Sequence, residues 1–332
     1  MKKITLSLVF ILLAFSMMMC KQKEKEQGFS FDEESELPEV AVPDFCADSA
    51  FSFVKAQTDF GPRVPNGDAH RQCANYLISK LKELCDTVCV QSFDAKAYDG
   101  KVLKSQNLIG TFNPKAEKRI ILAAHWDSRP FADHDPDPAN HNKAIDGAND
   151  GASGVGVLLE VARQLSCNKP NVGVDIIFFD AEDYGAPEGA SEPPGNWWGL
   201  GSQYWASHPH VDQYTARYGI LLDMVGDPNA HFRYEMHSKM FARDVLVNVW
   251  NAAYRLGFGK TFLQSDSHPI TDDHYYVNTI AHIPMIDIIH QEDASGTGFP
   301  LTWHTLNDNI NHIDKNMLAK VGTTLLYVVY HE

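Results

Sequence analysis

The sequence predicts an α/β fold in which one central β-sheet is covered by helices on both faces. Short apolar runs alternate with segments of helical periodicity along most of the chain, which is typical of this class. The 332 residues are 44% hydrophobic and 21% charged, a composition that suits a folded globular protein. Neither an internal repeat nor a linker divides the region 45–332, so we expect one domain there.

Short apolar runs predict the strands, and apolar residues at helical spacing predict the helices. The runs that predict strands are 107–112, 119–127, 175–180, 218–225 and 284–289. The segments that predict helices are 68–84, 152–165, 240–256 and 314–330. Long irregular stretches lie at 129–142, 185–199 and 291–301. Loops of that length in a compact domain are usually functional or disordered.

The N-terminal residues have the pattern of an export signal. Lys2 and Lys3 supply positive charge, and an apolar run follows from Ile4 to Met19 and ends at Cys20. The run is shorter than a membrane-spanning helix needs. Its pattern resembles a bacterial lipoprotein signal, in which the cysteine is lipidated and becomes the mature N-terminus. A plain secretory peptide and an uncleaved anchor are the alternatives.

These features divide the chain into three parts. We expect a lipoprotein signal peptide at 1–20, a polar, flexible tether at 21–44 and the folded domain at 45–332. The protein would then be exported and held on the periplasmic side of a membrane, or at the cell surface, only by the lipid on Cys20.

The charge and the cysteines limit the classes of partner and of site. A formal net charge of -15 argues against nucleic acid or an anionic membrane surface as the main partner, because both require a basic face. Soluble peptides or small molecules fit better. Besides Cys20 there are five cysteines: Cys46, Cys73, Cys85, Cys89 and Cys167. Cys85 and Cys89 are close enough in sequence to form a disulfide. No cysteine stands in a zinc-binding Cys-x-x-Cys pattern, so structural thiols are the favoured interpretation.

Polar residues of metal-binding type follow the ends of the expected strands, where an open α/β sheet binds ligands. They are His125 and Asp127, Asn149 and Asp150, Glu182 and Asp183, Asp223, and His304. Nitrogen and oxygen ligands from separate loops, without a thiolate, match a catalytic zinc site with one open coordination position. Glu182 directly precedes the candidate ligand Asp183, so an extended backbone would point one side chain at the metal and the other at the substrate.

This series resembles the zinc aminopeptidases of the M28 type and, within that superfamily, the bacterial glutaminyl cyclases. The motifs that carry the resemblance are Phe60-Gly61-Pro62-Arg63-Val64-Pro65, Phe178-Phe179-Asp180-Ala181-Glu182-Asp183, Gly199-Leu200-Gly201-Ser202, Asp272-Asp273-His274, and Phe299-Pro300 followed by Trp303-His304-Thr305. The likeness extends from about residue 45 to the end. It implies a zinc-exopeptidase-like single domain with a twisted mixed sheet.

The resemblance also implies an activity and a role for each site residue. Such an enzyme converts the N-terminal glutamine of peptides or proteins to pyroglutamate and releases ammonia. One Zn²⁺ bound by Asp150, Asp183 and His304 would polarise the γ-carboxamide, and Glu182 would shuttle the proton. Asp223 and Asp272 would form a carboxylate network beside Glu182. Trp303, with Trp197 or Trp198, would wall the glutamine pocket.

The sequence departs from the animal enzymes at several positions. Those enzymes have glutamate where Asp183 stands, glutamine at the position of Thr271 and histidine at the position of Asp287, where we expect a substrate contact. The acidic insertion 133–141 has no counterpart that we can align. Its His134 and His141 could bind a surface metal, but a solvated loop is the favoured interpretation. The favoured roles of His268, His274, His282 and His290 are capping and packing.

Two other functions compete with the cyclase. A di-zinc aminopeptidase would hold a second metal with His125, Asp150 and Asp223, and Glu182 would activate a bridging water. A catalytically silent lipoprotein that binds a peptide or glycan should show a broken constellation of site residues. Trp303 directly before His304, together with the tryptophan-bearing loop after Asp183, favours the narrow amide pocket of a cyclase.

Overall fold

The computed structural model describes residues 40–332. The expected signal peptide with Cys20 lies outside the described residues, as does the tether up to residue 39. The compact unit runs from Ala41 to Glu332 and so begins four residues before the expected boundary at 45. Val42 accounts for this difference, because it is half-buried against the hydrophobic core although it precedes residue 45.

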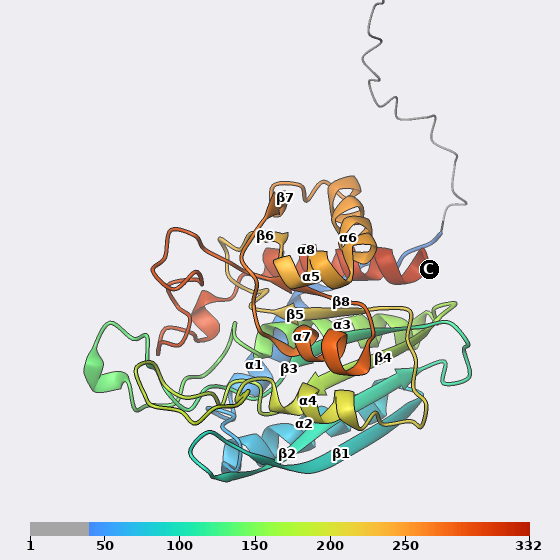
Figure 1. Ribbon diagram of the computed structural model, residues 1–332. Helices are drawn as coiled ribbons and strands as arrows, with labels where there is room; N and C mark the ends of the chain where they lie inside the picture. Colours follow the sequence, from blue (N-terminus) through green and yellow to red (C-terminus); the bar gives the residue numbers. More distant parts are fainter. Residues whose placement is uncertain (1–39) are drawn as a thin grey trace, which may run out of the picture. The chain divides into compact units, whose positions relative to one another are not determined.

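The centre of the fold is a six-stranded sheet (Figure 1). Its strands, in spatial order, are β1 (Thr87–Lys96), β2 (Val102–Phe112), β4 (Gly173–Phe179), β3 (Arg119–His125), β5 (Gly219–Asp223) and β8 (Met285–Ile289). β4, β3, β5 and β8 are parallel, whereas β1 and β2 form a hairpin that joins β4 antiparallel. The predicted mixed α/β sheet is therefore confirmed.

Alternate residues of the inner strands serve two separate cores, as strand geometry requires. Ile120 and Leu122 pack with the larger helices, which are α1 (Ala47–Thr58), α2 (Asp68–Leu84), α3 (Ala152–Cys167), α6 (Arg243–Arg255) and α8 (Lys315–Tyr330). Ile121 and Ala123 face the opposite side, where Trp205 of α4 (Leu200–Ser207) packs on the sheet. Helices thus cover both faces, and β4 is buried along its whole length.

The remaining elements are short. They are α5 (Met236–Phe241), α7 (Asp273–Tyr276), the π-helix Val277–Ala281, the 3₁₀-helices Pro138–Asn140 and Ile310–His312, and a second sheet that pairs β6 (Phe232–Tyr234) with β7 (Phe262–Asp266). The single helix expected at 240–256 is two helices in the structure, because the backbone breaks at Ala242 with φ -139°. No helix within residues 40–332 has the length and hydropathy of a membrane span.

All five cysteines in the described part of the chain are free thiols. Cys85 and Cys89 lie at the end of α2 and in β1, and they do not form the disulfide that their spacing permits. Burial raises the pKa of the Cys73 and Cys85 thiols to about 12, which suits structural rather than reactive thiols.

Candidate metal centre and pocket

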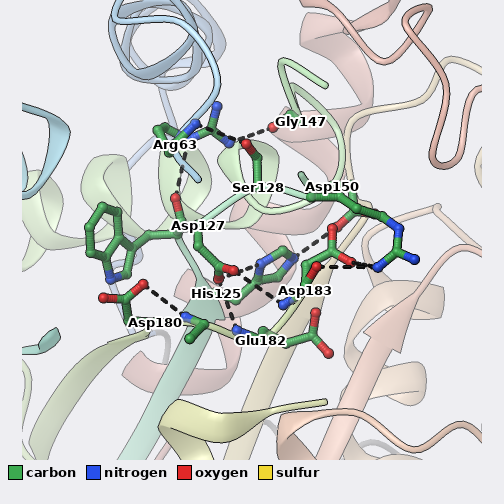
Figure 2. A network of polar contacts seen from close by, with 12 residues as sticks. Arg63, His125, Asp127, Ser128, Gly147, Asp150, Asp180, Glu182 and Asp183 are labelled. Atoms are coloured by element: carbon green, nitrogen blue, oxygen red, sulfur yellow. Dashed lines mark hydrogen bonds and ion pairs between the residues drawn. The ribbon is translucent and has the colours of Figure 1, made fainter. Parts of the chain in front are cut away.

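The polar residues predicted from the strand ends meet at one edge of the sheet. His125 and Asp223 are the last residues of the parallel strands β3 and β5. Glu182 and Asp183 follow β4, and Asp150 stands two residues before α3. Figure 2 shows His125, Asp150, Glu182 and Asp183 close together at this edge.

The three predicted zinc ligands converge. Ligand atoms of Asp150, Asp183 and His304 lie within 4.8 Å of one another, and all three residues are buried. His304 Nε2 is 3.3 Å from Asp183 Oδ1 and 3.6 Å from Asp150 Oδ2. Asp183 Oδ2 is buried and has no hydrogen-bond partner among the described residues. A buried carboxylate oxygen without a partner fits a missing cation, and this donor set suits zinc.

A second cluster shares Asp150. His125 Nε2 lies 2.9 Å from Asp150 Oδ1 and 3.3 Å from Asp223 Oδ1, and these three residues also offer ligand atoms within 4.8 Å of one another. The arrangement therefore brings together the ligands of the one-metal and of the two-metal site.

Asp127 positions the segment that carries Glu182 and Asp183. Its two carboxylate oxygens accept hydrogen bonds from the backbone N–H groups of Glu182 and Asp183, both at 3.1 Å. Ala181 has φ 54°, in the left-handed region, so the chain turns here. Residues 181–183 form a bend and do not continue β4. The turn, rather than strand alternation, brings both side chains to the pocket.

Asp150 is held by a residue that the sequence did not indicate. Asp308 accepts hydrogen bonds from the backbone of Asn149 at 2.7 Å and of Asp150 at 3.0 Å. Gly151, with φ 95°, follows, and a Cβ atom there would lie 2.7 Å from the Asp127 carbonyl oxygen and 2.9 Å from the His125 ring. Only glycine fits this turn at the start of α3.

Left-handed backbone recurs at the site. Ala181, Met224 and His304 have φ values of 54°, 49° and 53°. This conformation costs a residue with a side chain on the order of 1–2 kcal/mol, and it clusters at functional sites. Each of the three is next to, or is, a predicted site residue.

Glu182, Asp223 and Asp272 form the predicted carboxylate group beside the metal ligands, and all three line the same cavity. Burial raises the pKa of Glu182 well above its usual range, and repulsion from Asp272 adds to the rise against the opposing effect of His125. Burial, with repulsion from Asp150, raises the pKa of Asp223 to about 8. The group therefore binds protons that isolated carboxyls would release at neutral pH.

The cavity has a volume of about 340 Å³, which is within the usual range for small-ligand pockets. Its polar end consists of Asp150, Glu182, Asp183, Asp223, Asp272 and His304. Its apolar walls include Trp198, Met224, Ile270, Ile289, Phe299 and Trp303. The Trp303 and His304 rings stack at 3.6 Å between centroids, and the Trp198 ring lies nearly parallel to His304 at 6.2 Å.

Two of the expected pocket residues do not line the cavity. Trp197 donates its indole N–H to the Pro193 carbonyl oxygen, and the structure thus selects Trp198 as the second wall. Asp287 is fully buried in β8, with its Oδ2 3.6 Å from His274 Nδ1. Asp287 therefore lies behind the pocket, next to Asp272 and His274, and the expected substrate contact is not supported.

The insertion 133–141 is only in part the solvated loop that we expected, since residues 136–139 are exposed but its two ends are not. Asp133 and Asp135 are buried, and the His134 ring packs against Trp303 at 4.6 Å between centroids. His141 is also held within the insertion, because its Nε2 lies 2.8 Å from the Asp135 carbonyl oxygen, at hydrogen-bond distance. Among the four histidines expected to cap or pack, His274 and His290 are buried, whereas His268 and His282 are exposed.

Comparisons with known proteins agree with this geometry. The model of Peptidase family M28 matches residues 107–329. A solved structure of a glutaminyl cyclase from Bacteroides thetaiotaomicron, bound to N-acetylhistamine, is 53% identical, with 88% of this chain and 100% of that chain covered and a TM-score of 0.85. A solved structure from Parabacteroides distasonis, described as a Zn-dependent exopeptidase, is 52% identical, with coverage of 88% and 100% and a TM-score of 0.87.

A curated relative matches over a shorter region. A glutaminyl-peptide cyclotransferase from Gloydius blomhoffii is 28% identical over 253 residues, which are 66% of this chain and 63% of that protein. The chain thus spans less than two thirds of the length of this relative.

Proposed function

Because the chain belongs to peptidase family M28, we propose that it is a zinc-dependent glutaminyl-peptide cyclotransferase that converts the N-terminal glutamine of peptides or proteins to pyroglutamate. The observation that carries the proposal is the small aromatic-walled cavity that has the ligand cluster and Glu182 at its polar end. Similarity to glutaminyl cyclases across most of the chain supports it.

Asp150, Asp183 and His304 would hold one zinc ion. Zinc bound there would act as a Lewis acid toward the γ-carboxamide of the substrate glutamine. The substrate's own α-amine attacks that carboxamide, so the reaction requires neither a serine nor a cysteine nucleophile.

Glu182 has the position and the proton affinity of the shuttle. It accepts a proton from the attacking amine and returns it to the departing ammonia, and both transfers are efficient when the carboxyl pKa is near neutrality. Its raised pKa fits this double task. Asp272 lies close enough to repel the ionised form of Glu182, and it thereby helps to retain the proton.

Trp198 and Trp303 would enclose the flat carboxamide group. Both indoles lie beside the His304 ring, with Trp198 nearly parallel to it. The proposed ligand His304 therefore also contacts both walls of the pocket. An apolar enclosure limits water at the reacting carbon, and this favours ring closure over hydrolysis.

The aminopeptidase remains the second candidate because His125, Asp150 and Asp223 also form a compact ligand cluster. The two functions differ in the number of zinc ions and in product. A silent binding protein is disfavoured, since the proposed ligands and Glu182 are all present and close together.

A paired assay tests the proposal. The purified protein is incubated with a glutaminyl peptide and, separately, with a leucyl arylamide, and its zinc content is measured. We expect ammonia release with formation of pyroglutamate, about one zinc per chain and little arylamide hydrolysis. Rapid leucyl cleavage by a protein with two zinc ions would establish the aminopeptidase instead.

We also propose that the protein is exported and anchored to a membrane by a lipid on Cys20. The charged start, the apolar run and the position of Cys20 support this assignment. Labelling of cells with a radioactive fatty acid tests it. The label should appear on the parent chain and not on Cys20→Ser, and an unlabelled parent chain would contradict the anchor.

A further inference from the structure

Arg129 and Asp133 form a buried ion pair beside the ligand cluster. Their side chains are almost fully shielded, with exposed fractions of 1% and 8% for the two residues. Arg129 Nε donates to Asp133 Oδ1 at 2.8 Å, and Nη2 donates to Asp133 Oδ2 at 2.6 Å. A buried pair of this kind contributes little net stability because both charges lose their hydration. Its contacts therefore indicate what else it does.

Asp133 faces the ring of His304 on the side away from the ligand cluster. Its Oδ1 lies 3.5 Å from His304 Nδ1, and that nitrogen is buried and makes no hydrogen bond within residues 40–332. The other ring nitrogen, Nε2, faces Asp150 and Asp183. Asp133 also accepts a hydrogen bond from the backbone N–H of Glu188 at 2.9 Å, which ties it to the loop that carries Trp198.

Arg129 also contacts the ligand cluster. Its Nη1 lies 3.4 Å from Asp183 Oδ1 and donates to the Asp183 carbonyl oxygen at 3.3 Å. The guanidinium carbon is 4.8 Å from the centre of the Trp198 ring, within cation–π distance. Arg129 thus contacts a ligand residue and a wall of the pocket while it holds Asp133.

We propose that Arg129 and Asp133 are a positioning pair for the metal centre. The Asp133 carboxylate, the charged group beside His304 Nδ1, would pair with the N–H at that nitrogen and so direct Nε2 at the metal, and Arg129 fixes Asp133 near Asp183 and Trp198. Metal-binding histidines usually donate their second ring N–H to a carboxylate, and loss of that carboxylate typically weakens metal binding 10–100-fold. The inference rests on the proposed zinc site but not on the identity of the substrate.

The test is the zinc affinity of the purified full-length chain, measured without substrate by competition with a chromogenic chelator. Asp133→Asn removes the charge with almost no change in shape, and we expect it to weaken zinc binding about 10–100-fold. Should this variant fail to fold, Asp133→Glu, which moves the carboxylate out of place, is expected to weaken zinc binding in the same direction.

Asp135→Asn is the matched control. Asp135 lies in the same loop, is equally buried and accepts hydrogen bonds from Leu306 N at 3.0 Å and Asn140 Nδ2 at 2.9 Å. It lies outside the ligand cluster around His304 and Asp183. We expect Asp135→Asn to keep the zinc affinity of the parent. Parent-like affinity in Asp133→Asn, or an equal loss in both variants, would overturn the positioning role.

A double variant tests whether the two residues act as a unit. Arg129→Lys keeps the charge but lacks the planar fork that makes both contacts with Asp133. If the pair is a unit, Arg129→Lys combined with Asp133→Asn should lose less affinity than the product of the two single losses. If the loss of zinc affinity in the double variant equals the product of the two single losses, the two residues act independently. A chain that shows these zinc losses but no cyclisation would refute the proposed function and leave the positioning pair standing.

Discussion

Glu182 is buried among other carboxyls and lies next to a metal ligand without belonging to the ligand cluster. Its replacement should therefore separate chemistry from metal binding. We expect Glu182→Gln to retain zinc and to lower kcat about 10²–10⁴-fold, since general acid–base catalysis typically contributes that much. Metal analysis and steady-state kinetics check both parts. Glu192→Gln, an exposed change on the loop that precedes Trp198, should behave like the parent; a zinc-loaded, fully active Glu182→Gln would contradict the shuttle.

Burial is the main cause of the raised pKa of Glu182, and repulsion from Asp272 adds to the rise, so the effect of removing that charge has a predictable sign. Glu182 must be ionised to accept the amine proton, so activity is lost as the pH falls through its raised pKa. Asp272→Asn removes one cause of the rise, which lowers the Glu182 pKa and moves the acidic limb of the profile of kcat/KM against pH to lower pH. The exposed change Asp244→Asn should leave the limb in place. An unchanged or upward-shifted limb in Asp272→Asn would contradict the coupling.

At the residue scale, the sequence predicted the candidate metal ligands but not the residues that hold them in place. Asp150, Asp183 and His304 were predictable because their residue types follow apolar runs and match a family pattern. Asp308, Arg129 and Asp133 were not. Each acts through hydrogen bonds to groups distant along the chain, and an arginine or an aspartate in a polar loop carries no sign of its burial.

Glu235 joins short elements behind the pocket. It caps α5 by accepting hydrogen bonds from His237 N at 2.8 Å and Ser238 N at 2.6 Å, and its Oε2 also pairs with His274 Nε2 of α7 at 3.0 Å. Burial alone would raise the pKa of Glu235, but the bond with His274 holds it at about 2.

Removal of the Glu235 charge should destabilise this region. Because the folded-state pKa is lowered, the contribution of Glu235 is complete above the unfolded value of about 4.3 and is lost as the pH falls through about 2. We expect Glu235→Gln to lower the free energy of unfolding at pH 7 by about 1.5–3 kcal/mol, because the charged hydrogen bond to His274 is lost while Asp287 stays beside that ring. Urea titration measures this. The exposed Glu83→Gln should change stability by less than about 0.5 kcal/mol, and an equal, small effect of both changes would refute the cap.

At the element scale, strongly periodic segments were predictable and weakly periodic ones were not. The five expected strands and the helices α2, α3 and α8 are all present. β1 gave no signal because it is an edge strand with mostly exposed or half-buried side chains. α4 begins after Gly199, with φ 59°, and its eight residues are too few to establish a helical period.

For the whole molecule, the parallel order β4-β3-β5-β8 explains why one metal site can form from distant residues. The carboxyl ends of parallel strands meet at one edge, so Asp183 after β4 lies at the same edge as His125 of β3 and Asp223 of β5, although the three are far apart in sequence. The fold class was predictable from the alternation of apolar runs and helical segments. The spatial order of the strands and the burial of Asp133 and Asp135 in the insertion depend on long-range packing that local patterns do not encode.

We propose that Asp150, Asp183 and His304 bind one zinc ion next to Glu182. Anomalous diffraction at the zinc edge, from crystals of the zinc-loaded protein, shows where the metal is bound. We expect one strong peak per chain, in contact with the side chains of these three residues. A second peak of similar height between His125, Asp150 and Asp223, or a peak away from His304, would contradict it.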